Sequence, residues 1–252
     1  MAFPRGYALF DLDHTLLPHD TQALFCNYVL KRERWRTLLH LIFLPFALLK
    51  ALRLISTVRA KRAFLGYLWG MDRRKLERYS REFAEQSVIP SAYPELMDEI
   101  ERHRSEGRVL VLNSASPDIY VAAVAEAFGF DHYFATKIVL GEPVHLHPMI
   151  GTNNKREAKI ETMLHHLPDL AKMTEEERND TCWAYSDSIA DLPLLRFGGS
   201  AVVIHPSPTL ATIAIRNEWG MMYPARPYSG KIGNLVAMLR QVLGVYPARP
   251  VS

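Results

Sequence analysis

Two aspartates separated by one residue stand near the N-terminus, where a short apolar run ends. Asp11 and Asp13 follow residues 7–10, Tyr-Ala-Leu-Phe, a segment suited to a buried strand. Side chains alternate along a strand, so residues two positions apart point the same way and the two carboxylates should converge. Like charges held so close are unfavourable unless a cation joins them. The pair therefore predicts a site for a divalent metal and a phosphate-bearing substrate.

The pattern Asp-x-Asp-x-Thr, formed by Asp11, Asp13 and Thr15, resembles the first signature motif of the haloacid dehalogenase (HAD) superfamily. This resemblance implies that Asp11 attacks phosphorus and forms an aspartyl-phosphate, while Asp13 first protonates the leaving oxygen and then activates water. Thr15 is expected to contribute to substrate binding. Dehalogenases of the superfamily lack the second aspartate, so the resemblance favours phosphoryl transfer. His14 stands where many relatives carry glycine.

A second apolar run, residues 108–113, ends in Ser114-Ala115-Ser116-Pro117 before a segment of helical character, residues 118–128. A strand that leads through small polar residues into a helix N-terminus is suited to binding an anion. The resemblance assigns Ser114 to the phosphate-binding hydroxyl of the second HAD motif. Ser116 is a further candidate for substrate binding, and capping of the helix is the alternative role for it.

Two lysines, Lys155 and Lys159, are candidates for the cation that the family uses against the phosphate. The family pattern places this lysine at the start of a helix after a short polar loop. Lys159 fits better, since Ile160, Met163 and Leu164 follow it at helical spacing. Lys155 is kept as the alternative.

A third apolar run, beginning at residue 181, breaks into a loop that carries Asp187 and Asp191 and resembles the fourth HAD motif. The resemblance makes Asp187 a direct metal ligand and Asp191 a further ligand or a group that orients the others. With Asp11 and Asp13, they form an oxygen-rich set suited to Mg²⁺. Ser186 stands where many relatives carry glycine, so the hydrogen bonding of this loop is open.

Strand-like runs at residues 7–10, 108–113, 181–185 and 201–204 alternate with helical segments, which predicts a parallel sheet of the doubly wound α/β type. The resemblance implies a HAD-like, Rossmann-like core with a helical cap inserted between the first and second motifs. Residues 1–17 and 91–252 are assigned to the core and residues 18–90 to the cap. The tail from residue 225, with helical character at residues 232–243, carries no evident chemistry.

The cap holds a nearly uninterrupted apolar stretch, residues 38–49, which contains Pro45 and is too short to span a bilayer as a helix. Residues 31–62 contain nine bases and one acid, a local charge of +8, whereas the whole chain carries only +3. Such a segment is typical of an interfacial or re-entrant anchor on an anionic membrane surface. A self-packed helical hairpin with a solvated basic rim is the alternative.

The apolar helix followed by Lys61 and by residues 64–70 resembles the cap of the phosphatidylglycerophosphatase C family, HAD enzymes that act on a phospholipid precursor. We therefore expect a Mg²⁺-dependent phosphatase for a phosphate monoester, with a phospholipid phosphate as the candidate substrate. The alternatives are a soluble metabolite phosphatase of the phosphoserine-phosphatase type and a non-catalytic membrane-associated protein. We expect a cytoplasmic protein at the inner membrane face and no nucleic-acid partner, and the oligomeric state is open.

Overall fold

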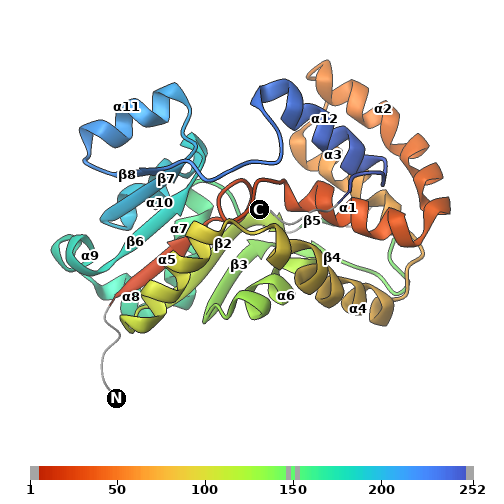
Figure 1. The fold of residues 1–252 in the computed structure, drawn as a ribbon. Helices are drawn as coiled ribbons and strands as arrows, with labels where there is room; N and C mark the ends of the chain where they lie inside the picture. Colours follow the sequence, from red (N-terminus) through yellow and green to blue (C-terminus); the bar gives the residue numbers. More distant parts are fainter. Residues whose placement is uncertain (1–5, 146–148, 151–153, 248–252) are drawn as a thin grey trace.

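The computed structural model describes residues 6–145, 149–150 and 154–247. Its centre is a sheet whose strands are all parallel and follow the order β3-β2-β1-β6-β7-β8 (Figure 1). The strands of this sheet are β1 (Tyr7–Phe10), β2 (Val109–Pro117), β3 (His132–Thr136), β6 (Trp183–Ser186), β7 (Ser200–Ile204) and β8 (Gly220–Met222). A separate antiparallel pair joins β4 (Ile138–Val139) to β5 (Met149–Ile150). The predicted α/β fold with a doubly wound parallel sheet is confirmed.

Alternation along β1 shows why helices cover both faces of the sheet. Ala8 and Phe10 face one core with α5 (Pro94–Ser105) and α6 (Asp118–Phe128), whereas Tyr7 and Leu9 face a second core with helices that follow β5. All four side chains are buried, as expected of a central strand between two layers. The helices between β5 and β8 are α7 (Glu157–His166), α8 (Pro168–Lys172), α9 (Glu175–Thr181), α10 (Leu192–Phe197) and α11 (Pro208–Arg216).

The segment between β1 and β2 is almost entirely helical. Besides α5, its helices are α1 (Thr21–Arg32), α2 (His40–Ala51), α3 (Thr57–Phe64) and α4 (Arg73–Phe83), with 3₁₀ turns η1 (Arg34–Leu39), η2 (Leu65–Leu68) and η4 (Ile89–Ser91) and a π-helical turn η3 (Ala84–Val88). A further 3₁₀ turn, η5 (Ile189–Asp191), follows β6. Asp20, Ser56 and Asp72 accept backbone N–H groups at the starts of α1, α3 and α4. The helical cap inserted between the first two motifs is thus present, and its limits at residues 18 and 90 remain our proposal.

The C-terminal helix α12 (Gly230–Val242) returns to the helices that precede β2. It packs against α1, and Figure 1 shows it beside α2 and α3, on the opposite side of the molecule from α11. Two hydrogen bonds join Asn27 of α1 to the backbone of Tyr246 beyond α12, each 3.1 Å long. The tail, which carries no evident chemistry in the sequence, is therefore a structural partner of the cap.

The apolar stretch of the cap folds into α2, which continues through Pro45 and packs against α3. On its outer face Leu41, Leu44 and Leu48 are 64%, 57% and 62% exposed. Their spacing places them on one side of the helix, while His40 is buried beside Phe64. Within residues 6–145, 149–150 and 154–247, no helix combines the length and apolar character needed to cross a bilayer.

The predicted limits differ from the observed ones at three strands, and for one of them by a single residue, since β7 begins at Ser200 rather than at residue 201. The run predicted at residues 108–113 forms β2 from Val109 and continues to Pro117, so the strand includes both Ser114 and Ser116. The run 181–185 begins too early, because Thr181 ends α9 and β6 starts at Trp183. In contrast, the predicted limits of the strand 7–10 and of the helix 118–128 are those observed.

We predict that Arg36→Met destabilises the cap. The Arg36 side chain is 3% exposed, donates to the carbonyls of Tyr67 and Trp69 at 2.9 and 2.7 Å, and pairs with Glu33 at 2.8 Å. Methionine would leave these acceptors without their donor, so the free energy of unfolding measured in urea should fall by about 3 kcal/mol.

Arg59→Met provides the matched control, since Arg59 is exposed on α3. Its effect should stay within about 0.5 kcal/mol. Equal effects of the two substitutions would show that the buried arginine does not hold the cap together.

Candidate active site

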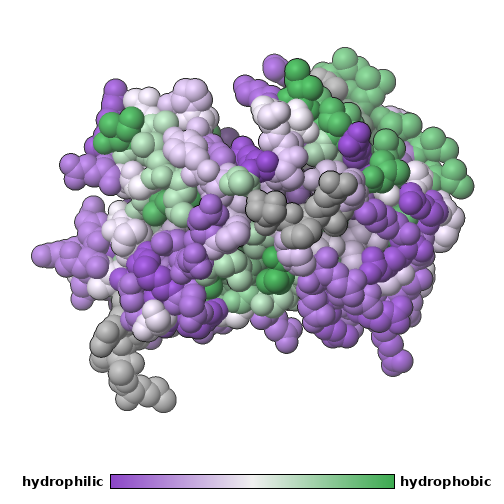
Figure 2. Space-filling view, in the orientation of Figure 1, coloured by the Kyte–Doolittle hydropathy of each residue, from purple (hydrophilic) through white to green (hydrophobic). Residues whose placement is uncertain are grey.

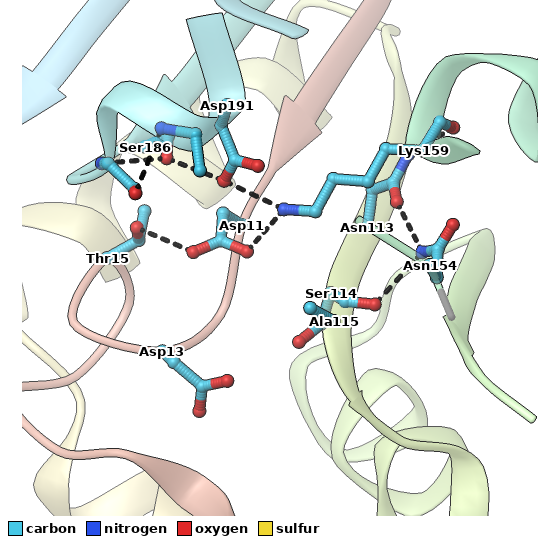
Figure 3. A network of polar contacts seen from close by, with 12 residues as sticks. Asp11, Asp13, Thr15, Asn113, Ser114, Ala115, Asn154, Lys159, Ser186 and Asp191 are labelled. Atoms are coloured by element: carbon cyan, nitrogen blue, oxygen red, sulfur yellow. Dashed lines mark hydrogen bonds and ion pairs between the residues drawn. The ribbon is translucent and has the colours of Figure 1, made fainter. Parts of the chain in front are cut away.

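The residues singled out in the sequence meet where β1, β2 and β6 end. These neighbouring strands are parallel, so the residues that follow them share one edge of the sheet. Figure 3 shows Asp11, Lys159 and Asp191 at the centre of a network of polar contacts. The Lys159 ammonium lies 2.7 Å from Oδ1 of Asp11 and 2.8 Å from Oδ2 of Asp191. One cation thus bridges the first and fourth motifs.

Lys159 comes from the first turns of α7 and is 1% exposed. Its backbone carbonyl accepts from the Asn113 side chain at 3.1 Å, which ties α7 to β2. Lys155, the alternative, precedes the helix and is exposed. The structure therefore brings Lys159, and not Lys155, to Asp11.

The second oxygen of Asp11 is held by Thr15. The Thr15 hydroxyl donates to Oδ2 of Asp11 at 3.1 Å and accepts the backbone N–H of Asp187 at 3.1 Å. Thr15 thereby links the first motif to the fourth and orients the Asp11 carboxylate. The predicted substrate-binding residue contacts the nucleophile candidate itself.

The carboxylate of Asp13 is turned away from Asp11, as Figure 3 shows. Its Oδ1 accepts from the backbone N–H and the hydroxyl of Thr21, at 2.7 and 2.5 Å. Its Oδ2 accepts from the Ser116 hydroxyl at 2.5 Å. Between the aspartates and α1 the chain turns at His14, whose φ of 59° is left-handed and explains why glycine suits this position.

Ser116 therefore neither caps α6 nor faces the centre of the network. Instead it holds Asp13 together with Thr21, the first residue of α1. Ser114 is completely buried, and its hydroxyl oxygen accepts the backbone N–H of Ser116 at 3.0 Å. Its carbonyl accepts from the Asn154 side chain at 2.9 Å.

Ser186 resolves the question left open for the fourth motif. Its hydroxyl donates to Oδ2 of Asp191 at 2.9 Å and accepts the backbone N–H of Ser188 at 3.2 Å. The serine thus supplies a side-chain hydrogen bond inside the loop. Asp191, engaged by both Lys159 and Ser186, is placed to orient the lysine.

Burial and crowding of negative charge dominate the electrostatics of the site. Burial raises the pKa of Asp11 to about 7, although Lys159 opposes the shift. Burial also raises the pKa of Asp187 to about 8, with repulsion from Asp11, Asp191 and Asp13 adding to it. Although burial lowers the pKa of Lys159, Asp11 and Asp191 outweigh it, so this pKa is raised. Lys159 therefore stays charged, and its single positive charge does not balance the negative charge of the neighbouring carboxylates.

The oxygen donors of the site fit Mg²⁺, but with fewer carboxylate ligands than the four aspartates that the sequence predicts. In the described part of the chain no three Asp, Glu, His or Cys side chains converge as metal ligands. The Asp13 carboxylate is engaged by Thr21 and Ser116, and one oxygen of Asp191 by Lys159 and Ser186. Each oxygen of Asp11 accepts one hydrogen bond, from Lys159 or from Thr15, and keeps a lone pair that a metal could use. With Asp187 and the backbone carbonyl of Asp13, Asp11 forms a candidate ligand set, and Mg²⁺ typically uses one or two carboxylates with water and phosphate.

Several residues of the site were missed in the sequence. Thr21 holds Asp13, Asn154 holds the strand end at Ser114, and Lys61 of α3 donates to the carbonyl of Ala115 at 3.4 Å. Only Thr21 had a local signal, because Asp20 and Thr21 mark a helix start just beyond the first motif. The other two come from segments far away in the sequence.

Comparison with known proteins agrees with this geometry. The family model described as haloacid dehalogenase-like hydrolase matches residues 8–196. The chain belongs to this family.

The relatives of this HAD chain include phosphatases. It is 28% identical over 231 residues to a Mycobacterium tuberculosis protein named "Probable phosphatase Rv3661", covering 89% of this chain and 77% of that protein. A Bordetella pertussis Tohama I structure of unknown function superimposes with a TM-score of 0.68 at 26% identity, covering 87% and 99% of the two chains. A phosphoserine phosphatase structure, that of a phospho-aspartyl intermediate analogue, superimposes with a TM-score of 0.56 at 15% identity, covering 97% and 100%. The chain is thus a HAD phosphoric monoester hydrolase.

For this HAD enzyme we predict that Asp187→Asn stabilises the metal-free protein at high pH. A carboxyl whose pKa is about 8 in the folded state, above its ordinary 3.8, favours folding at low pH and loses that contribution as pH rises. Between about pH 4 and 8 the free energy of unfolding of the wild type should fall, relative to that of the variant, by up to about 1.4 kcal/mol per pH unit. Urea unfolding across this pH range, with metal removed, measures the difference. A difference that does not change with pH would contradict the raised pKa of Asp187.

Proposed function

We propose that the protein is a Mg²⁺-dependent phosphatase that hydrolyses a phosphate monoester through an aspartyl-phosphate on Asp11. The observation that carries this proposal is the orientation of the Asp11 carboxylate, fixed by Lys159 on one oxygen and Thr15 on the other. A carboxylate held in one orientation at the end of a central strand is suited to attack a phosphorus atom. The similar phosphoserine phosphatase structure, an analogue of a phospho-aspartyl intermediate, supports the same kind of intermediate here.

In the first step a carboxylate oxygen of Asp11 attacks phosphorus, and the bond from phosphorus to the substrate's alcohol oxygen breaks. Asp13 donates its proton to this leaving oxygen. Thr21 and Ser116 hold Asp13 away from Asp11 in this structure, each at 2.5 Å from one of its oxygens, so in this proposal Asp13 turns from these two hydroxyls toward the leaving group.

In the second step water attacks phosphorus, and Asp13, now a carboxylate, takes a proton from it. The bond between phosphorus and Asp11 breaks, which releases inorganic phosphate and restores the nucleophile. Lys159 balances the charge on the transferring group, and the Ser114 hydroxyl is available to donate to a phosphate oxygen because the contact from Ser116 uses only its acceptor side.

Asp11, Asp187 and the carbonyl of Asp13 would hold Mg²⁺. When bound, the ion would supply positive charge that stabilises the phosphoryl group and offsets the repulsion among the carboxylates. The raised pKa values of Asp11 and Asp187 support this assignment, because both reflect buried negative charge that a cation would stabilise. Lys159 and Asp191 then orient Asp11 without being ligands in this proposal.

We further propose that the substrate is a phospholipid phosphate such as phosphatidylglycerophosphate. The support is the outer face of α2, where exposed leucines lie next to the bases of the cap. Such a face suits an anionic membrane surface, at which the enzyme would bind peripherally on the cytoplasmic side. The competing substrate class is a soluble metabolite, as for phosphoserine phosphatase. A non-catalytic role is disfavoured, because Asp11, Asp13, Lys159 and Asp187 are all present.

We predict that Asp11→Asn lowers phosphate release from soluble and lipid monoesters by about 1000-fold or more, since the amide cannot serve as the nucleophile. Acid quenching followed by intact mass spectrometry should detect a phosphorylated wild-type chain and no such species for the variant. Chelation of divalent cations should abolish wild-type activity, and Mg²⁺ should restore it.

Asp98→Asn is the control for this substitution, because Asp98 is exposed on α5 away from the network. Its activity should equal that of the wild type. Turnover that persists in Asp11→Asn would refute the aspartyl-phosphate mechanism.

We also predict that the double substitution Leu44→Asp with Leu48→Asp weakens binding to vesicles of anionic phospholipid by about tenfold or more, because each change removes apolar surface and adds negative charge. Co-sedimentation measures the affinity. Ile215→Asp is the control, since Ile215 is 67% exposed on α11, on the other side of the molecule. If the wild type ignored anionic vesicles and preferred soluble monoesters to phosphatidylglycerophosphate, the lipid assignment would be wrong.

A further inference from the structure

An apolar groove lies between α12 and the helices of the cap. One wall is formed by Phe43 of α2 with Ala60 and Phe64 of α3, and the other by Met238, Leu239 and Val242 of α12. The start of α1 and Lys50 complete the lining, and the volume of this open groove is about 390 Å³. This volume is typical of a small-ligand site. The groove exists only because the C-terminal helix returns to pack against α1.

Two residues that line this groove contact the segments that hold the catalytic residues. Lys61 and Asp20 belong to its lining. The Lys61 ammonium donates to the carbonyl of Ala115, the residue between Ser114 and Ser116. Asp20 caps α1, whose first residue, Thr21, holds Asp13. A molecule in the groove therefore comes within reach of the site at which we place the phosphate.

Both walls of the groove continue into exposed apolar surface. Leu41, Leu44 and Leu48 project from α2, and Leu243, the residue that follows α12, is 54% exposed. Figure 2 shows apolar atoms gathered over α2 and α12 at the upper right, while the surface below them is mostly hydrophilic. The groove thus borders both the charged residues Lys61 and Asp20 and the most apolar face in this view.

We infer that this groove binds the hydrocarbon chain of an amphiphilic phosphate monoester while its phosphate lies at Asp11, so that α12 forms part of the substrate site. The inference rests on the proposed phosphatase function and adds a chain-binding subsite to it. The polarity of the groove matches such a ligand, because Lys61 lies on the side of the site and aromatic and aliphatic side chains line both walls. The groove's continuity with the apolar face gives a hydrocarbon chain a path that avoids water.

The test uses straight-chain alkyl phosphates from ethyl to octyl as dissolved monomers, with no membrane present. Each methylene group buried in the groove should raise kcat/KM about fourfold, until the chain fills the available length. The wild type should therefore prefer octyl to ethyl phosphate by about 100-fold or more. Phosphate release at substrate concentrations below KM measures this ratio.

Leu239→Gln and Leu235→Gln form a matched pair, since both leucines lie on α12 and are 50% exposed, but only Leu239 lines the groove. Leu239→Gln should reduce the octyl-to-ethyl ratio about tenfold, and Leu235→Gln should leave it at the wild-type value. Ala60→Phe, which fills the groove from the α3 wall, should shift the preferred chain to a shorter length.

Hydrolysis of all alkyl phosphates at equal efficiency would overturn the groove inference and leave the proposed phosphatase function intact. Equal losses in the two leucine variants would also overturn it, because the preference would then arise from general surface hydrophobicity. Failure to hydrolyse any monoester in the presence of Mg²⁺ would refute the proposed function, and the subsite with it.

Discussion

The buried contact of Lys159 with Asp11 and Asp191 is the interaction on which the rest of the site depends. Removing three charged groups from water is costly, and their attraction offsets that cost only when the geometry is good and other hydrogen bonds complete it. Here Thr15, Ser186 and Asn113 complete it, and through them the contact joins β1, β2, β6 and α7 at one edge of the sheet. Burial raises the pKa of Asp11 and Asp187, and repulsion from the neighbouring carboxylates adds to the shift, so a cation suits the site.

The cap contributes to the chemistry as well as covering it. Thr21 at the start of α1 and Ser116 at the end of β2 hold the same carboxylate, so Asp13 joins the core to the inserted helices. Helix α12 extends this connection, since it packs on α1 and forms one wall of the apolar groove beside Lys61. In our proposals the position of the cap therefore affects proton transfer and substrate selection together.

The sequence was most informative where function depends on local pattern. A strand that ends in Asp-x-Asp-x-Thr located Asp11, Asp13 and Thr15, and the apolar positions after Lys159 favoured it over Lys155, which the structure leaves exposed. The sequence was less informative about which side chains form hydrogen bonds with one another. Ser116 was expected to bind substrate or to cap α6, yet it donates to Asp13, a residue 103 positions away. Lys61 stood in the pattern of the cap, but no local signal assigned Lys61 or Asn154 to the site, because their partners lie on segments distant in the sequence.

The sequence by itself determined the family, the parallel sheet and the identity of the central charged residues, because alternation along strands and motif spacing are properties of short segments. The tertiary structure alone decided that the Asp13 carboxylate faces Thr21 and Ser116, that Asp191 serves Lys159, and that α12 and the cap enclose a groove. These features depend on contacts between distant segments, whose packing and burial set the direction of each side chain. No local pattern of apolar and polar residues records that packing.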